Sequence, residues 1–430
     1  MSESEIRLLS LNCWGLKYVA KNRTERIQAI ARFLADSDHD IVALQEIWVF
    51  ADYEHVLESV SKRLPHSKFF YSGALGAGLA IFTRFPIVTT SVNPYSLNGS
   101  PIDVAAGDWF VGKAAASVTI LHPVLGHVQI FNTHLFAKGG EDGPEYNRAH
   151  RLVNAWEFAK LTRQAAERGR YVIALGDFNS IPPTLPMTVI RDHASLTDSW
   201  VVTHPNPDAT SVTNALEAIT KLGITADSPL NSYSAAKGYA AGSWGKRLDY
   251  VLYRQPERHQ TSPGQTFPLL KAKECKVVLT DPVPGYNFSY SDHFGLDATL
   301  HIEASDVQNA EASKELSNAS IATTIQALTA CYRFSRERSR KELVIFALCI
   351  ILLLAIIIGS AWLPHSWINP IFMLFTVFIA WLATTMLYEG FLYGNWECNA
   401  LMNVIEELEI YRKGLDIQSG VQRDVGDYVG

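Results

Sequence analysis

Two uncharged apolar runs near the C-terminus constrain this chain more than any other feature. Residues 343–363 (LVIFALCIILLLAIIIGSAWL) and 368–388 (INPIFMLFTVFIAWLATTMLY) each have the length that crosses a bilayer as an α-helix. Only residues 364–367 separate the runs. Two helices of a soluble core would be expected to keep a polar face, and neither run has one. We therefore predict a transmembrane hairpin.

A group of basic residues just before the first run predicts the orientation of the hairpin. The group consists of Arg333, Arg336, Arg338, Arg340 and Lys341. Since basic residues flank the cytoplasmic side of membrane spans, we expect everything before the hairpin and the C-terminal tail to be cytosolic. The N-terminus lacks a signal-peptide-like apolar segment, and the scattered cysteines fit a reducing compartment. We expect an integral protein of the endoplasmic reticulum or mitochondrial membrane.

Composition divides the remaining chain. We predict one globular domain over residues 1–302, a linker and juxtamembrane helix over 303–342, and an amphipathic helix with a tail over 389–430. In the last segment Leu401, Val404, Ile405 and Leu408 share one helical face. This face could pack on a helix around residues 321–332 as an antiparallel stalk, lie on the membrane, or form a homo-oligomer.

The predicted globular domain alternates short apolar runs with a few amphipathic segments. Strands are expected at residues 6–12, 40–46, 77–83, 114–121, 127–135, 171–179, 247–253 and 294–302. Helices are expected at 23–35, 53–64 and 146–167. Strands mixed with outer helices predict an α/β sandwich.

Polar side chains stand at the ends of several of these strands. They are Asn12, Glu46, His134, Asp177 with Asn179, Asp249, and Asp292 with His293. A single polar residue at a strand end is usually a turn residue, but so many together are harder to explain in that way. Carboxylate and amide oxygens suit Mg²⁺, and a histidine beside a carboxylate suits a general base. The set predicts metal-assisted hydrolysis of a phosphate ester.

The segment GDWFVGKA, residues 107–114, nearly matches a nucleotide-binding phosphate loop. Ala114 stands where that loop needs Ser or Thr, and the residues that follow predict a strand where the loop needs a helix. The segment is therefore not expected to be a phosphate loop that binds ATP or GTP.

The motifs LNCWG, LQE, NTHL, GDFN, RLDYVLY and SDH, in this order, resemble the endonuclease/exonuclease/phosphatase superfamily. Together with YSLNGSP, GDWFVGKA, AHRLVNAWE and the C-terminal hairpin, they resemble the neutral sphingomyelinases and the fungal inositol phosphosphingolipid phospholipases C. The resemblance implies a deoxyribonuclease I-like four-layered α/β sandwich. It also implies phospholipase C type hydrolysis of sphingolipid phosphodiesters to ceramide and a phosphorylated headgroup, with no nucleic-acid partner.

The resemblance further implies roles for individual residues. Glu46 is expected to be the principal ligand of Mg²⁺, for which Mn²⁺ could substitute, with Asn12 and Asp292 beside it. His293 is expected to be the general base, oriented by Asp249. Asn179 and His134 are expected to hold the phosphate oxygens. Asp177 is expected to position water or to protonate the leaving oxygen. Lys113 is expected to move toward the phosphate when Asp108 releases it. The alternative for Lys113 and Asp108 is a surface ion pair.

Competing functions remain open at this point. A nuclease of the same fold would not be expected to have a membrane hairpin or a net charge of −6. An inositol polyphosphate phosphatase would carry a different motif at residues 245–250, and a non-enzymatic scaffold would show damaged catalytic positions. We expect anionic phospholipids to activate the enzyme through the basic group. His122, His127, His150 and His193 are expected at the surface or at helix ends, outside the site.

Overall fold

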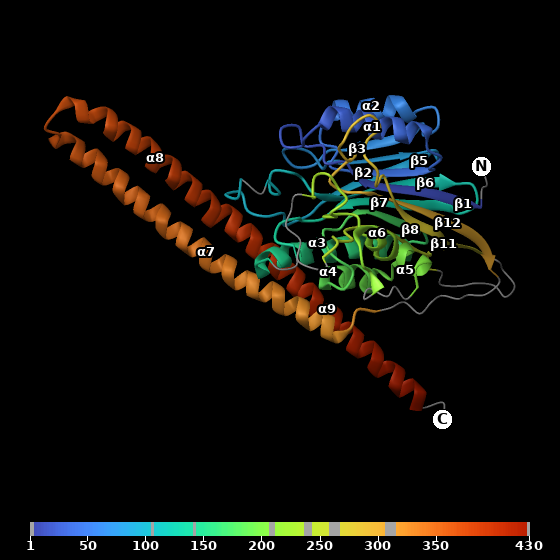
Figure 1. Ribbon diagram of the computed structural model, residues 1–430. Coiled ribbons are helices and arrows are strands. Elements are labelled where there is room, and N and C mark those ends of the chain that lie inside the picture. The colour runs from blue at the N-terminus through green and yellow to red at the C-terminus, as the bar shows by residue number, and fades with distance from the viewer. Residues whose placement is uncertain are drawn as a thin grey trace.

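The computed structural model describes residues 4–104, 107–140, 143–205, 211–235, 243–257, 267–305 and 315–427. Two six-stranded sheets pack face to face, helices cover both outer faces, and a long helical hairpin projects from one side (Figure 1). The expected four-layered α/β sandwich with a C-terminal hairpin is confirmed.

The first sheet has the order β11-β12-β1-β2-β4-β3. Its strands are β1 (Glu5–Asn12), β2 (Ile41–Gln45), β3 (His66–Phe70), β4 (Leu79–Thr83), β11 (Phe267–Val278) and β12 (Gly295–Ser305). The second sheet has the order β5-β6-β7-β8-β10-β9. Its strands are β5 (Ile87–Pro94), β6 (Ala114–His122), β7 (Gly126–His134), β8 (Tyr171–Asp177), β9 (Thr197–Asp198) and β10 (Asp249–Arg254).

Burial explains why the central strands read as continuous apolar runs. Every residue of β2, β4, β8 and β10 is buried, because each strand is covered by the other sheet on one face and by helices on the other. The predicted strands correspond to the central strands of both sheets. The sequence reading missed the edge strands β3, β5, β9 and β11.

Helices complete the outer layers. On the first sheet lie α1 (Arg23–Asp36) and α2 (Phe50–Val60), the latter beginning and ending earlier than predicted. Ile27, Ile30 and Leu34 of α1 share one face and join the apolar cluster of this sheet. On the second sheet lies α3 (Glu145–Glu167), followed along the chain by the short helices α4 (Leu185–Thr188), α5 (Ser199–Thr203) and α6 (Ala215–Leu222).

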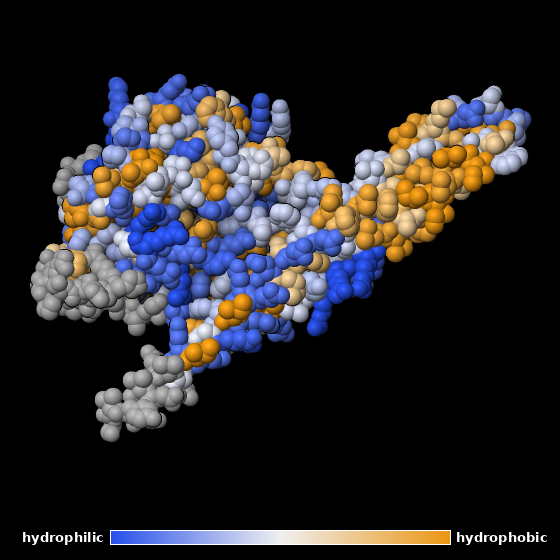
Figure 2. All heavy atoms as spheres, turned by 180° about the vertical axis from the view of Figure 1, so that it is seen from behind, coloured by the Kyte–Doolittle hydropathy of each residue, from blue (hydrophilic) through white to orange (hydrophobic). Residues whose placement is uncertain are grey.

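The hairpin consists of α7 (Asn318–Gly359) and α8 (Asn369–Leu387), and α9 (Gly394–Asp427) follows after a π-helical segment, Tyr388–Tyr393. The juxtamembrane segment and the first apolar run, predicted as separate parts, form one continuous helix of 42 residues. In the most apolar stretch of each long helix, only 6% of the first and 17% of the second is buried in the molecule. Figure 2 shows the apolar surface concentrated on this hairpin. Both helices are thus long and apolar enough to span a membrane.

The helix α9 returns along α7 and packs on the sandwich. Leu401, Val404, Ile405 and Leu408 lie in one apolar cluster with residues of α3 and α7, including Ile321. The antiparallel stalk is therefore the correct alternative for this face. Residues 306–314, within the predicted linker, lie outside the described part of the chain.

The topology brings many loops to one end of the sandwich. β1 and β2 are parallel, as are β7 and β8, while β12, β10 and β6 run antiparallel to β1, β8 and β7. The loops after β1, β2, β7 and β8 and those before β6, β10 and β12 therefore gather at one end, which we call the site end. In Figure 1 the start of β1 lies on the side away from the hairpin, so the site end faces the hairpin.

Candidate active site

Three polar residues lie side by side where central strands of the second sheet meet the site end. His134 of β7 is paired in register with Asp177 of β8, and Asp177 is paired with Asp249 of β10. All three are buried. Strand pairing alone therefore places an imidazole and two carboxylates in one row.

His293 forms a dyad with Asp249. The His293 Nδ1 atom lies 2.8 Å from Asp249 Oδ2, and His293 Nε2 lies 3.9 Å from Asp177 Oδ2. Because Nδ1–H donates to Asp249, Nε2 is left to accept a proton. Burial lowers the pKa of His293, but the carboxylates of Asp249 and Asp177 outweigh it and raise this pKa well above the ordinary value. The arrangement is that of a strengthened general base.

Asn12 links the two sheets. Its Nδ2 donates to Glu46 Oε1 at 3.1 Å and to Asp177 Oδ2 at 3.0 Å. Glu46 follows β2 with a positive φ of 54°, a strained conformation of the kind found at functional sites. The close approach of Gly15 allows this geometry, since a Cβ there would lie 2.4 Å from the Glu46 carbonyl oxygen.

The electrostatics of Glu46 fit a cation site. Burial and the neighbouring Asp292 carboxylate raise the pKa of Glu46 to about 7. Two carboxylates that repel each other, together with an amide, form a set of hard oxygen donors, and a divalent cation would relieve the repulsion. Glu46, Asn12 and Asp292 therefore fit a metal such as Mg²⁺.

Asp177 lies at the centre of the site. Its Oδ1 accepts a hydrogen bond from the Asn179 amide at 2.9 Å, and the Asn179 side chain donates to the Leu135 carbonyl at 3.0 Å. Burial raises the pKa of Asp177 to about 6; the charge of His293 opposes the shift and that of Asp249 adds to it. Asp177 can therefore hold or release a proton near neutral pH.

Lys113 reaches the same site from the start of β6. Its Nζ lies 2.7 Å from Asp108 Oδ1, 3.2 Å from His134 Nε2 and 3.0 Å from the Leu135 carbonyl. The ion pair considered for Lys113 and Asp108 is present, but its expected surface location is wrong, because only 2% of Lys113 and 7% of Asp108 are exposed. No helix follows Lys113, because β6 begins at Ala114, and the exclusion of a phosphate loop holds.

His134 is held neutral by its surroundings. Burial lowers its pKa well below the ordinary value, and the charges of Lys113 and His293 lower it further. Since Lys113 donates to Nε2, this nitrogen is an acceptor in the structure. Movement of Lys113 would free it for another partner.

Arg26 is a residue that the sequence reading missed. Its guanidinium donates to the carbonyls of Cys13 at 2.7 Å, Trp14 at 2.7 Å and Tyr290 at 3.1 Å, and it lies 5.0 Å from the Trp14 ring. Arg26 thus ties the loop after Asn12 to the loop before Asp292. One sequence pattern could have indicated Arg26: it is a charged residue on the apolar face of an amphipathic helix, one turn before Ile30.

The structure brings all the predicted site residues together at the site end. Of the histidines expected at the surface or at helix ends, His193 ends the π-helical segment Val189–His193, whereas His122 and His150 are buried and lie at neither kind of position. The residues that read the headgroup are expected between Asn206 and Gly245, and of these, residues 206–210 and 236–242 lie outside the described part of the chain.

A second group, His150, Cys331 and Glu397, has ligand atoms within 4.8 Å of one another. His150 Nδ1 accepts from the Gly99 amide at 3.0 Å, so Nε2–H donates to Glu397 at 2.8 Å. Glu397 also pairs with Arg338 at 2.6 Å, and burial raises the pKa of the Cys331 thiol to about 12. His150, Arg338 and Glu397 therefore form a hydrogen-bonded network that joins α3, α7 and α9.

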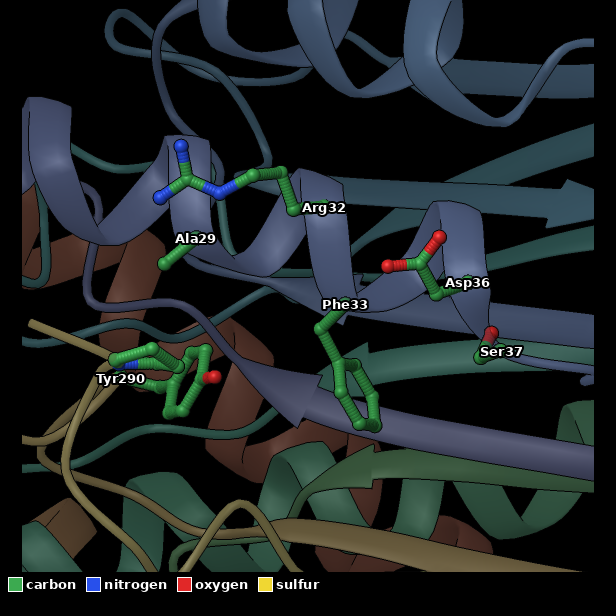
Figure 3. Close-up of a pocket in the computed structure, with 7 residues that line it drawn as sticks. Ala29, Arg32, Phe33, Asp36, Ser37 and Tyr290 are labelled. Carbon is green, nitrogen blue, oxygen red and sulfur yellow. The ribbon is translucent and has the colours of Figure 1, made fainter.

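An open groove of about 410 Å³ lies along α1, lined by Ala29, Arg32, Phe33, Asp36, Ser37, Pro284 and Tyr290. In Figure 3 the Phe33 ring points from α1 toward the strands, while Arg32 points away. None of the candidate catalytic residues lines this groove. It is therefore distinct from the site.

Comparison with known proteins agrees with this geometry. Residues 9–293 match the Endonuclease/Exonuclease/phosphatase family. The chain is 37% identical to the inositol phosphosphingolipids phospholipase C of Schizosaccharomyces pombe, with 94% of each chain covered. It is 30% identical to the protein of the same name from Saccharomyces cerevisiae, covering 94% of this chain and 89% of that one. It is also 30% identical to human sphingomyelin phosphodiesterase 2, covering 70% of this chain and 66% of that one.

Proposed function

This chain belongs to the endonuclease/exonuclease/phosphatase family and, within it, to the inositol phosphosphingolipid phospholipases C and neutral sphingomyelinases. From that premise we propose that it hydrolyses the phosphodiester of a membrane sphingolipid to ceramide and a phosphorylated headgroup. The observation that carries the proposal is the His293–Asp249 dyad, which faces Asp177 beside the oxygen-donor set of Glu46.

Water is the nucleophile in this proposal. His293 Nε2 takes a proton from the water that attacks phosphorus, and Asp249 holds the ring in the required tautomer. Such a base typically contributes about 10²–10⁴-fold in rate. As the bond between phosphorus and the ceramide oxygen breaks, Asp177 donates a proton to that oxygen, which its raised pKa supports.

Glu46, Asn12 and Asp292 would hold Mg²⁺, with Mn²⁺ as a substitute. The ion would supply neutralisation of the phosphodiester charge and stabilisation of the departing oxygen. Asn179, Lys113 and His134 would contact the non-bridging oxygens.

We infer that Lys113 alternates between two partners. In the structure it is held by Asp108 and covers His134 Nε2. Turning the ammonium toward the phosphate would free His134 and add a positive charge where negative charge develops.

The hairpin would anchor the enzyme beside its substrate, which raises the effective concentration to about the millimolar range. We propose that both ends of the chain are cytosolic and that anionic phospholipids activate the enzyme. Arg333, Arg336 and Arg340 are exposed for this contact, at about 1 kcal/mol each near the surface. Arg338 is not available to lipids, because it pairs with Glu397.

The proposal is tested with the purified full chain in nanodiscs that contain inositol phosphoceramide or sphingomyelin. We expect ceramide release in Mg²⁺, none in EDTA, and a loss of at least 100-fold in His293→Ala. Release from only one lipid assigns the headgroup. Release from neither lipid, with phosphate released from inositol phosphates instead, would favour a phosphatase and overturn the proposal.

A further inference from the structure

Several loops at the site end expose large apolar side chains. Within the described part of the sandwich, the most exposed are Tyr18 (91%), Val104 (69%), Val19 (63%) and Tyr71 (62%). Isolated exposed apolar residues are common on soluble proteins and need no explanation. Their concentration at the end that carries the active site does need one.

The topology shows why these residues share one end. Tyr18 and Val19 follow β1, and Val104 lies in the loop that leads into β6. Tyr71 follows β3, which runs antiparallel to β4 as β2 does, so that β3 ends at the same end as β2. The three loops therefore lie at the end of the sandwich that carries the catalytic residues.

Hydrogen bonds to residues that follow α8 fix the position of the loop that leads into β6. The Ser100 hydroxyl lies 3.2 Å from Glu389 Oε2, and the Trp396 indole donates to the Ser96 carbonyl at 2.9 Å. Tyr393 donates to the Gly99 carbonyl. Glu389 directly follows the second apolar run, so Ser100 lies where the chain leaves the predicted membrane span.

Ile102 and Val104 lie beyond this anchor point. Val104 is four residues from Ser100, a reach of at most about 14 Å. Ile102 is also exposed. Both side chains are therefore held within reach of the bilayer surface, and their apolar area would leave water if they entered it.

The loop after β1 has the composition of a membrane interface. The exposed Lys17 and Lys21 flank Tyr18 and Val19. Tyrosine is enriched at bilayer interfaces, and lysines beside it are attracted to anionic headgroups.

We propose that the loops with Tyr18 and Val19, Tyr71, and Ile102 and Val104 form an interfacial surface that enters the headgroup region of the bilayer. This surface holds the site end against the membrane, so that a sphingolipid headgroup enters the site without leaving the lipid layer. The proposal rests on the proposed function for the identity of the substrate, but its occupant, the bilayer, is tested independently.

The first test measures membrane contact without using activity. A fluorophore is attached to Val19→Cys, Val104→Cys or Val124→Cys of the full chain in a Cys398→Ser background, because the other native cysteines are buried. Val124 is an exposed control on the turn between β6 and β7, at the opposite end of the sheet. In nanodiscs with brominated lipid, we expect quenching at positions 19 and 104 at least threefold greater than at 124.

Equal quenching at the three positions would overturn the surface. Shielding of positions 19 and 104 from a soluble quencher without lipid quenching would indicate a second copy of the chain, and would overturn it as well. Strong lipid quenching in a protein that releases no ceramide would keep the surface and remove the proposed function. Ceramide release without lipid quenching would keep the proposed function and remove the surface.

The second test compares substrates. Ile102→Ser with Val104→Ser should lower turnover of sphingolipid in nanodiscs about tenfold and leave turnover of a short-chain, water-soluble analogue unchanged. The matched control, Leu121→Ser with Val124→Ser, should change neither. Loss on both substrates, or on neither, contradicts a membrane-contact role.

Discussion

Replacing Lys113 by methionine separates its role in stability from its role in catalysis. Methionine keeps much of the apolar stem but removes the ammonium that lies 2.7 Å from Asp108. A buried carboxylate then loses its counter-charge, which costs about 3–5 kcal/mol. Adding Asp108→Asn removes the unpaired carboxylate charge. The asparagine keeps an oxygen that can accept from the Lys138 backbone amide, as Asp108 does in the wild type. The double variant should lose only about 1–2 kcal/mol.

The two variants should differ in stability but not in activity. At about 2–4 °C per kcal/mol, thermal unfolding of the full chain in detergent should fall by about 6–20 °C in Lys113→Met and by about 2–8 °C in the double variant. Loss of one charged donor at the phosphate should lower turnover by about 10²–10³-fold in both. Turnover is measured as ceramide release well below the lower melting temperature.

Recovery of turnover together with stability in the double variant would contradict a catalytic role of the Lys113 ammonium. Lys113 would then act only by pairing with Asp108, and the proposed contact with the substrate phosphate would be removed.

Further predictions concern the dyad, the metal ligands and Arg26. Asp249→Asn removes the charge that raises the pKa of His293, so the acidic limb of the pH profile of kcat/KM should move to lower pH while the maximum falls about 10²–10⁴-fold; an unmoved limb would argue against the dyad. In EDTA, the raised pKa of Glu46 should make the wild type less stable as pH rises from 4.5 to about 7, by up to about 3 kcal/mol, because the folded state binds the proton more tightly. Urea titrations at pH 5 and 8 should show a larger loss in the wild type than in Glu46→Gln, which keeps only the pH dependence of Asp177 and His293, and Mg²⁺ should restore only the wild type; the same pH dependence in both would exclude Glu46 as a source. Arg26→Lys keeps the charge but cannot span the carbonyls of both ligand loops, so the half-saturating Mg²⁺ concentration for turnover should rise about tenfold. An unchanged Mg²⁺ dependence would leave Arg26 with a purely structural role.

The central strands could be predicted from sequence, and the edge strands could not, for one physical reason. A strand covered on both faces is a continuous apolar run, as in β8. β5 begins directly after Pro86 and exposes most of its side chains, and β11 carries three lysines. Such features protect a sheet edge from further pairing, and they also remove the apolar signal of a strand.

The candidate site could be predicted because its residues directly follow or precede apolar runs, as Asp177 and Asp249 do. Arg26 has no such marker, since its partners are backbone carbonyls from distant segments. The pairing of His150 with Glu397 joins residues 247 positions apart, and no local pattern contains it. The burial of His150 therefore depends on tertiary packing and could not be predicted from local sequence.

The hairpin could be predicted from apolar length, but the continuity of α7 could not. The charged residues before the first run interrupt its apolar pattern and suggest a boundary. In the structure the helix continues through them, with Lys341 paired to Glu337 at 2.8 Å and Arg338 to Glu342 at 3.5 Å, each one turn apart.

In the proposed reaction, activated water attacks phosphorus and releases ceramide with its oxygen intact. Hydrolysis of inositol phosphoceramide or sphingomyelin in H₂¹⁸O, followed by mass spectrometry of both products, tests it directly. We expect one ¹⁸O atom in the phosphorylated headgroup, none in ceramide, and no labelled product with His293→Ala. Label in ceramide, or undiminished labelling with His293→Ala, would contradict it.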